Sequence, residues 1–301
     1  MTTTAPAPTP TAPATGGLLT GVGRSTRAEL LRLRKWPAVW ITLGTWLTLS
    51  LMFGYLFNYL SYATGDNSFT NEGASQAALL AEMMPANAPN VFLQGMPMFG
   101  GALVMVLGAI VAGNGYGWGT WKTVFSLGAH RSGAILGSLG ALTVFVVATL
   151  VASFALDLGL SLLVATTESQ DIVMPSLASV GEAAGAGFLL MEMWALIGFA
   201  LGTIARGPAL SVGLGLVWAL VVENLLRGVG QLLGWIESLT TVLPGTAGGS
   251  LIGSIVGVDG VDTPPGVLDT VSGTQAAITV AIYIVVAVAV SVVVVRRRDV
   301  A

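Results

Sequence analysis

The sequence has no cysteine, a single histidine (His130) and few charged residues. Without cysteine the chain can form neither a disulfide nor a thiolate metal site, and one histidine excludes a histidine-based metal cluster within one chain. Only 9% of the residues are charged and 54% are hydrophobic, whereas a soluble domain has about 25% charged residues. This composition is typical of a chain surrounded mostly by lipid. No basic, aromatic-rich surface indicates nucleic-acid binding.

The chain has only two lysines, Lys35 and Lys122. Neither completes the G-x-x-x-x-G-K-[ST] motif, so we expect no phosphate loop and no ATP bound by this chain itself. The nearest approach to a hydrolase elbow, around Ser211, lacks its first glycine and has no base within reach. We therefore predict that the chain is not an enzyme and holds no cofactor.

Most of the sequence consists of long apolar stretches. About 20 apolar residues cross the hydrocarbon core as a helix, and six stretches reach or approach this length. The expected fold is all-α, a polytopic membrane protein with six transmembrane helices at about residues 37–63, 97–115, 134–163, 185–205, 209–226 and 275–295. The pairs Gly133–Gly137 and Gly198–Gly202 also have the spacing of close helix packing.

The basic residues lie in alternate gaps between these stretches. All except Arg227 fall in four groups: Arg24, Arg27, Arg32, Arg34 and Lys35; Lys122 and Arg131; Arg206; and Arg296, Arg297 and Arg298. The remaining gaps are acidic, including residues 64–96. Basic residues favour the cytoplasmic side of a membrane protein. The pattern therefore predicts a multi-pass protein of the cell membrane with both termini in the cytoplasm.

The N-terminal region is expected to contain a tail and then an interfacial helix. Residues 1–17 are rich in Thr, Ala and Pro and carry no charge, so we expect a disordered tail that reaches about residue 23, followed by a membrane domain over 24–298. They do not resemble a signal peptide. In residues 24–36, Leu30 and Leu33 share a face among five basic residues, which predicts an amphipathic helix at the inner interface. A solvated juxtamembrane segment is the alternative.

Residues 228–257 are apolar enough to suggest a seventh span. Pro244 and the glycines that follow it would break a helix and leave backbone groups unpaired in lipid. A seventh crossing would also place the basic C-terminal triplet outside. We therefore predict one or two short helices that enter the membrane from the outer face and return.

Three carboxylates fall within the predicted spans or at their edges, at Asp157, Glu192 and Glu223. A charge in lipid is costly, so such residues face a cavity, a partner or the interface. The simplest interpretation places Asp157 and Glu223 at helix ends in headgroup water. Glu192 lies deeper and is the better candidate for a pathway or a structural pair.

The predicted inner loop at residues 115–133 is short and aromatic. Trp118, Trp121 and Phe125 recur at spacings of three and four, so we expect them to share one face of a short helix. An exposed apolar face of this kind indicates docking to a partner protein. An aromatic belt at the membrane interface is the alternative.

Taken in order, these features resemble the permease subunits of ABC-2 type (type V) transporters. A basic amphipathic segment precedes the first span, and a W-G-T-x-K/R block lies between spans two and three, here Trp118, Gly119, Thr120, Trp121 and Lys122. The block continues through Leu127 to Arg131, and a Leu-Pro pair, Leu243 and Pro244, precedes the last span. The chain departs from the family at Gly115 and Ser138, where members often carry a Glu and a Lys.

The resemblance implies roles for three segments. The ATPase-coupling helix would comprise Trp118, Gly119, Thr120, Trp121, Lys122, Phe125, Leu127, His130 and Arg131. A connecting helix would comprise Arg27, Leu30, Leu33, Arg34 and Trp36, and residues 228–257 would form an outer re-entrant gate. The implied partners are cytoplasmic ABC ATPase subunits that carry ATP and Mg²⁺ and a second permease, identical or related. The implied activity is export.

Two other functions remain open from the sequence. One is a secondary transporter driven by an ion gradient, with Glu192 as its protonation site. The other is a non-transporting membrane anchor or sensor subunit that uses the same contact with an ATPase.

Overall fold

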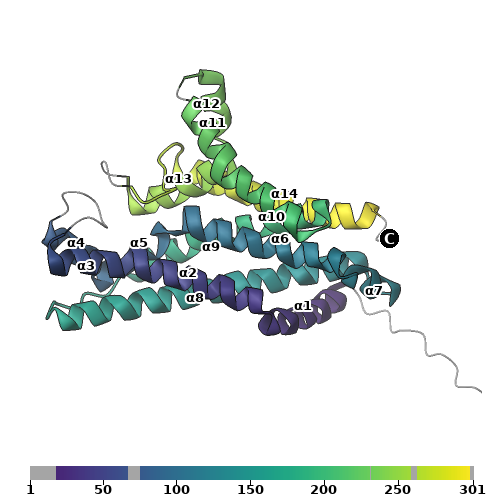
Figure 1. The fold of residues 1–301 in the computed structure, drawn as a ribbon, viewed down its shortest axis with the longest axis horizontal. Coiled ribbons are helices and arrows are strands. Elements are labelled where there is room, and N and C mark those ends of the chain that lie inside the picture. Colours follow the sequence, from purple (N-terminus) through teal and green to yellow (C-terminus); the bar gives the residue numbers. More distant parts are fainter. Residues whose placement is uncertain (1–17, 67–74, 231, 259–262, 299–301) are drawn as a thin grey trace, which may run out of the picture.

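The computed structural model describes residues 18–66, 75–230, 232–258 and 263–298. These residues form helices and connecting turns, with no strand among them. Figure 1 shows long helices that run side by side along one axis, while α11 (Glu223–Gly230) and α12 (Gly234–Thr240) project away from the bundle. The predicted all-α, polytopic architecture is confirmed.

Six helical runs in the described part of the chain are long and apolar enough to cross a membrane, as predicted. Three of them contain a π-helical turn: η1 (Met52–Leu56), η3 (Met96–Gly100) and η4 (Val217–Val222). The runs are α2–η1–α3 (Pro37–Thr64), η2–α5–η3–α6 (Pro85–Gly117), α8 (Arg131–Thr167), α9 (Leu177–Ala205), α10–η4–α11 (Pro208–Gly230) and α14 (Gly273–Arg297). Their segments are α2 (Pro37–Leu51), α3 (Phe57–Thr64), η2 (Pro85–Asn87), α5 (Ala88–Gln94), α6 (Gly101–Gly117) and α10 (Pro208–Leu216).

Two runs begin well before their predicted starts. The second begins at Pro85 rather than about residue 97, because Pro85, Pro89 and Pro97 each occupy the first turn of a helical segment. A proline is tolerated there, since its missing N–H would have no helical partner. The fourth begins at Leu177 rather than about residue 185, because Ser176 caps it by accepting a hydrogen bond from the Ser179 amide.

The amphipathic N-terminal helix is present as α1 (Leu18–Lys35). It begins six residues before the predicted start at residue 24, so residues 18–23 are helical rather than part of a tail. The predicted disorder of residues 1–17 lies outside the described residues. Gly137 and Gly140 of α8 allow α1 to approach closely, because a methyl group at Gly137 would overlap the Cβ of Ser25. The helix therefore packs on the bundle as well as presenting a basic face.

The centre of the bundle is a close contact between α6 and α9. A methyl group at Gly108 of α6 would overlap the carbonyl oxygen of Ala195, and one at Gly198 of α9 would overlap that of Met105. A methyl group at Gly202 would lie 2.5 Å from the carbonyl oxygen of Ala109. Small residues at such positions let two helix backbones meet, which is how helices associate in lipid. The prediction that Gly198 and Gly202 mediate close packing is confirmed.

The segment before the last span is a broken helix pair, as predicted. α12 (Gly234–Thr240) and α13 (Pro244–Val256) meet at an angle of 70°. The break lies at Leu243, which is extended, and at Pro244, which opens α13. Unlike α12, α13 is largely buried, and it packs against α14 and α9.

Candidate functional site

The segments predicted to form the inner loops lie at one end of the bundle, called here the basic end. In Figure 1 the N-terminal end of α1, α7 (Thr120–Ser126) and the C-terminal end of α14 lie toward this end. Arg131 donates to the carbonyls of Val295 and Arg298, at 3.3 and 3.0 Å, and Arg298 donates to the carbonyl of Ile204 at 3.1 Å. The arginines therefore tie together α8, α9 and α14 at this end.

The aromatic residues of the predicted coupling helix do not share one exposed face, and that prediction was wrong. Gly119 adopts a left-handed conformation with φ of 66°, so α6 ends before Trp118 and α7 begins after it. Trp118 is 64% exposed, whereas Trp121 is only 3% exposed. Trp121 stacks on Phe125 at 5.7 Å, and its indole N–H donates to the Ala112 carbonyl at 3.4 Å.

Residues of this segment other than Trp121 and Phe125 are the exposed ones. Lys122, Leu127 and His130 are exposed, and Leu127 is 82% exposed despite being apolar. Thr120 opens the short helix after the Gly119 turn. Arg131 places its guanidinium 5.7 Å from the Phe125 ring, which links the segment to the start of α8. The solvent-facing features are thus Trp118, Lys122 and Leu127.

Four of the five residues of the predicted connecting helix lie on α1, and Trp36 follows its last residue. Leu33 is buried and Leu30 is partly buried against the bundle, while Arg27 and Arg34 are exposed. Trp36 terminates the helix and meets Trp118 edge-to-face at 5.9 Å. The end of α1 and the turn before α7 therefore form one continuous surface at the basic end.

Asp157 is fully buried and lies ten residues before the end of α8, so its predicted position at a helix end in headgroup water was wrong. Ser50 of α2 donates to its Oδ1 at 3.1 Å. Tyr55 of η1 donates to its backbone carbonyl at 2.8 Å, and one turn earlier Ser153 accepts a 2.6 Å hydrogen bond from Trp46. These polar contacts fasten the first span to α8.

Glu223 is also fully buried, so the same prediction fails for it. One carboxylate oxygen accepts from the Trp218 indole at 2.9 Å, and the other accepts from the Gly245 amide at 2.8 Å. The carboxylate therefore caps the start of α13 just after Leu243 and Pro244, where the helix dipole favours negative charge. Glu223 joins the fifth span to the broken segment.

Glu192 lies deep in the bundle, as predicted, and is 5% exposed. Thr143 of α8 donates to its Oε1 at 2.6 Å, and its Oε2 has no hydrogen-bond partner among the described residues. The three buried carboxylates stay apart, and the described part of the chain holds no group of three His, Cys, Asp or Glu side chains that could bind a metal ion.

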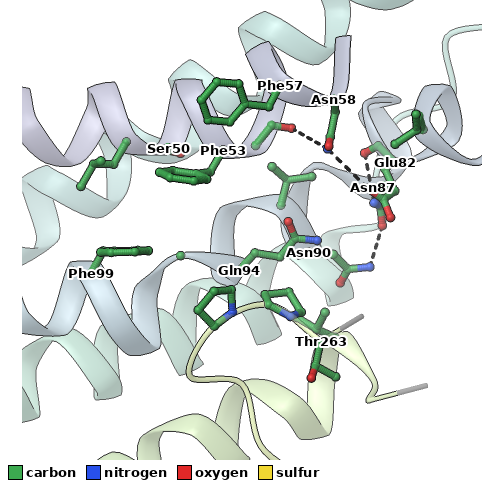
Figure 2. A pocket seen from close by; sticks show the side chains of 18 of the residues that line it. Ser50, Phe53, Phe57, Asn58, Glu82, Asn87, Asn90, Gln94, Phe99 and Thr263 are labelled. Atoms are coloured by element: carbon green, nitrogen blue, oxygen red, sulfur yellow. Dashed lines mark hydrogen bonds between the residues drawn. The ribbon is translucent and has the colours of Figure 1, made fainter. Parts of the chain in front are cut away.

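A cavity that the sequence analysis missed lies at the opposite end of the bundle from the basic residues. It has a volume of about 550 Å³ and is enclosed by the first span, α4 (Gln76–Glu82), α5, η3 and the segments on either side of residues 259–262. Figure 2 shows phenylalanine rings on one side and carboxamide groups on the other. Its residues come from segments far apart in sequence, so no local motif indicates it.

Comparison with known proteins assigns no family, because no protein-family model matches the chain and no curated protein matches it significantly.

Proposed function

We propose that this chain is the membrane-spanning permease subunit of an ABC exporter, driven by separate ATPase subunits that bind ATP and Mg²⁺. The observation that carries the proposal is the arrangement at the basic end. A short helix between the second and third spans, α7, lies beside the end of an amphipathic helix, α1, which packs on the bundle. The broken pair α12–α13 before the last span also fits the proposal.

In this proposal the basic end faces the cytoplasm, together with both termini. Lys122, Arg131, Arg206 and Arg298 lie there, and basic residues favour the cytoplasmic side of a membrane. A second permease, identical or related, would complete the pathway, because the six spans of this chain are half of the usual pathway in the family that the sequence resembles. The exposed residues Trp118, Lys122 and Leu127 would enter the groove of the ATPase.

The contacts of α7 suggest how movement would be transmitted. Trp121 anchors α7 to the end of α6, and Arg131 links the Phe125 ring to the C-terminal turn of α14. A displacement of α7 would therefore move α6, α8 and α14 together as rigid elements. ATP would drive the cycle only if the ATP-bound ATPase prefers one permease conformation over the other.

The test is association with an ATPase that carries a phosphate loop, encoded in a neighbouring open reading frame and co-expressed. Leu127→Asp should abolish co-purification of the ATPase, because a charge replaces the most exposed apolar residue of the segment. Leu232→Asp is a matched control, since Leu232 is 83% exposed but lies between α11 and α12. Normal co-purification of the Leu127→Asp variant would defeat the coupling role.

Proton-driven transport is a second candidate, favoured by the buried Glu192 with one carboxylate oxygen lacking a partner among the described residues. Transport in ATP-free vesicles under a pH gradient, lost in Glu192→Gln, would support it over the ABC mechanism. A function that persists with a catalytically dead ATPase would instead support an anchor or sensor role.

A further inference from the structure

The cavity at the end opposite the basic end has the size of a ligand site. Its volume is about 550 Å³, and pockets that hold small molecules measure about 300–1,000 Å³. Residues of the first span, α4, α5 and η3 line it, together with Pro264 and Pro265. None of the residues already assigned a role at the basic end contributes to it.

One wall of the cavity is aromatic and is built on two π-helical turns. Phe53 of η1 and Phe99 of η3 stack at 5.8 Å with an interplanar angle of 13°, and Phe57 meets Phe53 edge-to-face at 5.3 Å. π-Helical turns are rare and occur frequently at functional sites. Here the two turns bring Phe53 and Phe99 of different spans face to face. The result is an apolar surface suited to a ring or an alkyl body.

The other wall is polar and includes one carboxylate. Asn58, Asn87 and Asn90 line it, and Figure 2 shows them around Glu82. Asn87 donates to the Glu82 backbone carbonyl at 3.1 Å, and Asn58 approaches the Glu82 carboxylate at 3.4 Å, which is a long contact. Asn90 donates to Asn87 at 2.7 Å. The carboxamides thus hold one another and position Glu82, whose carboxylate keeps capacity for a cation.

The described residues that line the cavity include one carboxylate, Glu82, and no positively charged side chain. The chain has no Lys, Arg or His between Lys35 and Lys122, or between Arg227 and Arg296, and these two stretches supply all of the lining residues. The positive-inside rule accounts for the absence of basic residues from these stretches, but acidic residues contribute little to that rule. The rule therefore does not account for the position of the Glu82 carboxylate beside an aromatic cavity.

We propose that this cavity binds an amphiphilic organic cation, with its apolar body against Phe53, Phe57 and Phe99 and its charged group facing Glu82. Aromatic faces attract cations as well as apolar groups, so the rings and the carboxylate act together. An anion is disfavoured there, because every charged residue in the surrounding stretches is acidic. The idea that this cation is an exported substrate rests on the proposed function. The idea that the cavity binds the cation does not depend on it.

The test uses tetraphenylphosphonium as the probe and tetraphenylborate as its charge-reversed counterpart. Binding is measured by equilibrium dialysis on the purified full chain in nanodiscs of zwitterionic lipid, with empty nanodiscs subtracted. We expect saturable binding of the cation and none of the anion. Glu82→Gln should raise the Kd for the cation about fivefold, the effect of losing one partly hydrated ion pair. Phe53→Leu should raise it about threefold, through the loss of a ring face.

Asp66→Asn is the matched control, because it removes one negative charge after α3 without altering the cavity lining. An unchanged Kd in this variant supports a local site. Equal weakening by Asp66→Asn and Glu82→Gln, equal binding of the anion, or no saturable binding would each overturn the inference. Because no ATPase is present, such a failure leaves the proposed function standing. Cation binding without any ATPase association would instead defeat the permease proposal and keep the binding site.

Discussion

At the scale of single residues, the two tryptophans on either side of Gly119 have opposite environments. Trp118 and Trp121 are three apart, but the left-handed Gly119 turn between them separates the end of α6 from the start of α7. Trp121 turns inward onto Phe125 and Gly115, where a methyl group would overlap its indole ring. Trp118 stays at the surface. Under the proposed function, Trp118 is therefore the tryptophan that would contact the ATPase, whereas Trp121 packs in the protein interior.

We predict that Trp121→Ala lowers the free energy of unfolding by about 3–5 kcal/mol, as expected for deletion of a buried aromatic side chain. Trp118→Ala should change it little, because that side chain is 64% exposed. Thermal unfolding of the purified variants in detergent measures both. Equal melting temperatures for the two variants would show that Trp121 is not part of the packed core.

Cation binding at the cavity should also depend on pH through Glu82. Loss of hydration at the cavity wall raises the pKa of Glu82 above its ordinary value, although the residue as a whole remains exposed. The nearby titratable side chains on the first span are the phenols of Tyr55, Tyr59 and Tyr62, and Asp66 follows that span.

Protonation removes the charge that faces the cation, so binding is strongest above the raised pKa and weakens as pH falls through it. We expect the affinity for tetraphenylphosphonium to fall as the solution is acidified, and the fall should begin at a higher pH than for an unperturbed glutamate, which titrates at about 4.3. The dialysis assay at each pH measures this. A pH profile that is unchanged in Glu82→Gln would assign the dependence to another group.

At the scale of elements, the contact between α6 and α9 depends on glycine. The backbone of each helix reaches the other at Gly108, Gly198 and Gly202, so no side chain separates them there. Gly185, near the start of α9, has no such contact, because a methyl group added there would have no neighbouring atom within 4 Å. The same residue type in one helix therefore marks a tight contact at one end and an exposed surface at the other.

We predict that Gly198→Ala destabilises the protein by about 1–3 kcal/mol, the usual cost of overpacking. The atom that a methyl group would meet is the Met105 carbonyl oxygen, and backbone moves only with its helix. Gly185→Ala in the same helix should leave stability unchanged or raise it by up to about 1 kcal/mol, because alanine favours helix more than glycine does. Thermal unfolding of both variants distinguishes a specific contact from a general effect of glycine.

At the scale of the whole molecule, charge is sorted between the two ends of the bundle. The basic end holds Arg131, Arg206 and Arg298, whereas the opposite end holds Glu82 and Glu168, the latter accepting from Tyr59 and Tyr62 at 3.1 and 2.9 Å. If the basic end is cytoplasmic, the cavity opens on the outer side.

The absence of cysteine makes this orientation directly testable. On intact cells, a membrane-impermeant maleimide should label Ala77→Cys on the exposed surface of α4 and leave Leu127→Cys unlabelled until the cells are permeabilised. Both positions are exposed in the structure, so accessibility to solvent does not by itself separate them. The reverse pattern would place the coupling segment outside and end the permease proposal.

The sequence by itself determined the six spans, the amphipathic N-terminal helix and the break at Leu243–Pro244. Each depends on local properties: the length of an apolar run, the face on which Leu30 and Leu33 lie, and the backbone limits of proline and glycine. Span boundaries were less accurate where Pro85 and Ser176 start helices inside predicted loops. These signals act within a few residues, so no tertiary contact is needed to interpret them.

Only the tertiary structure decided which side chains are buried by protein and which face lipid. Both environments are apolar, so the pattern of hydrophobic residues is the same for a core and for a lipid-facing surface. Trp121, Asp157 and Glu223 are buried because of partners on other helices, and the cavity at Glu82 exists because separate segments meet around it. Such long-range contacts leave no local trace in the sequence.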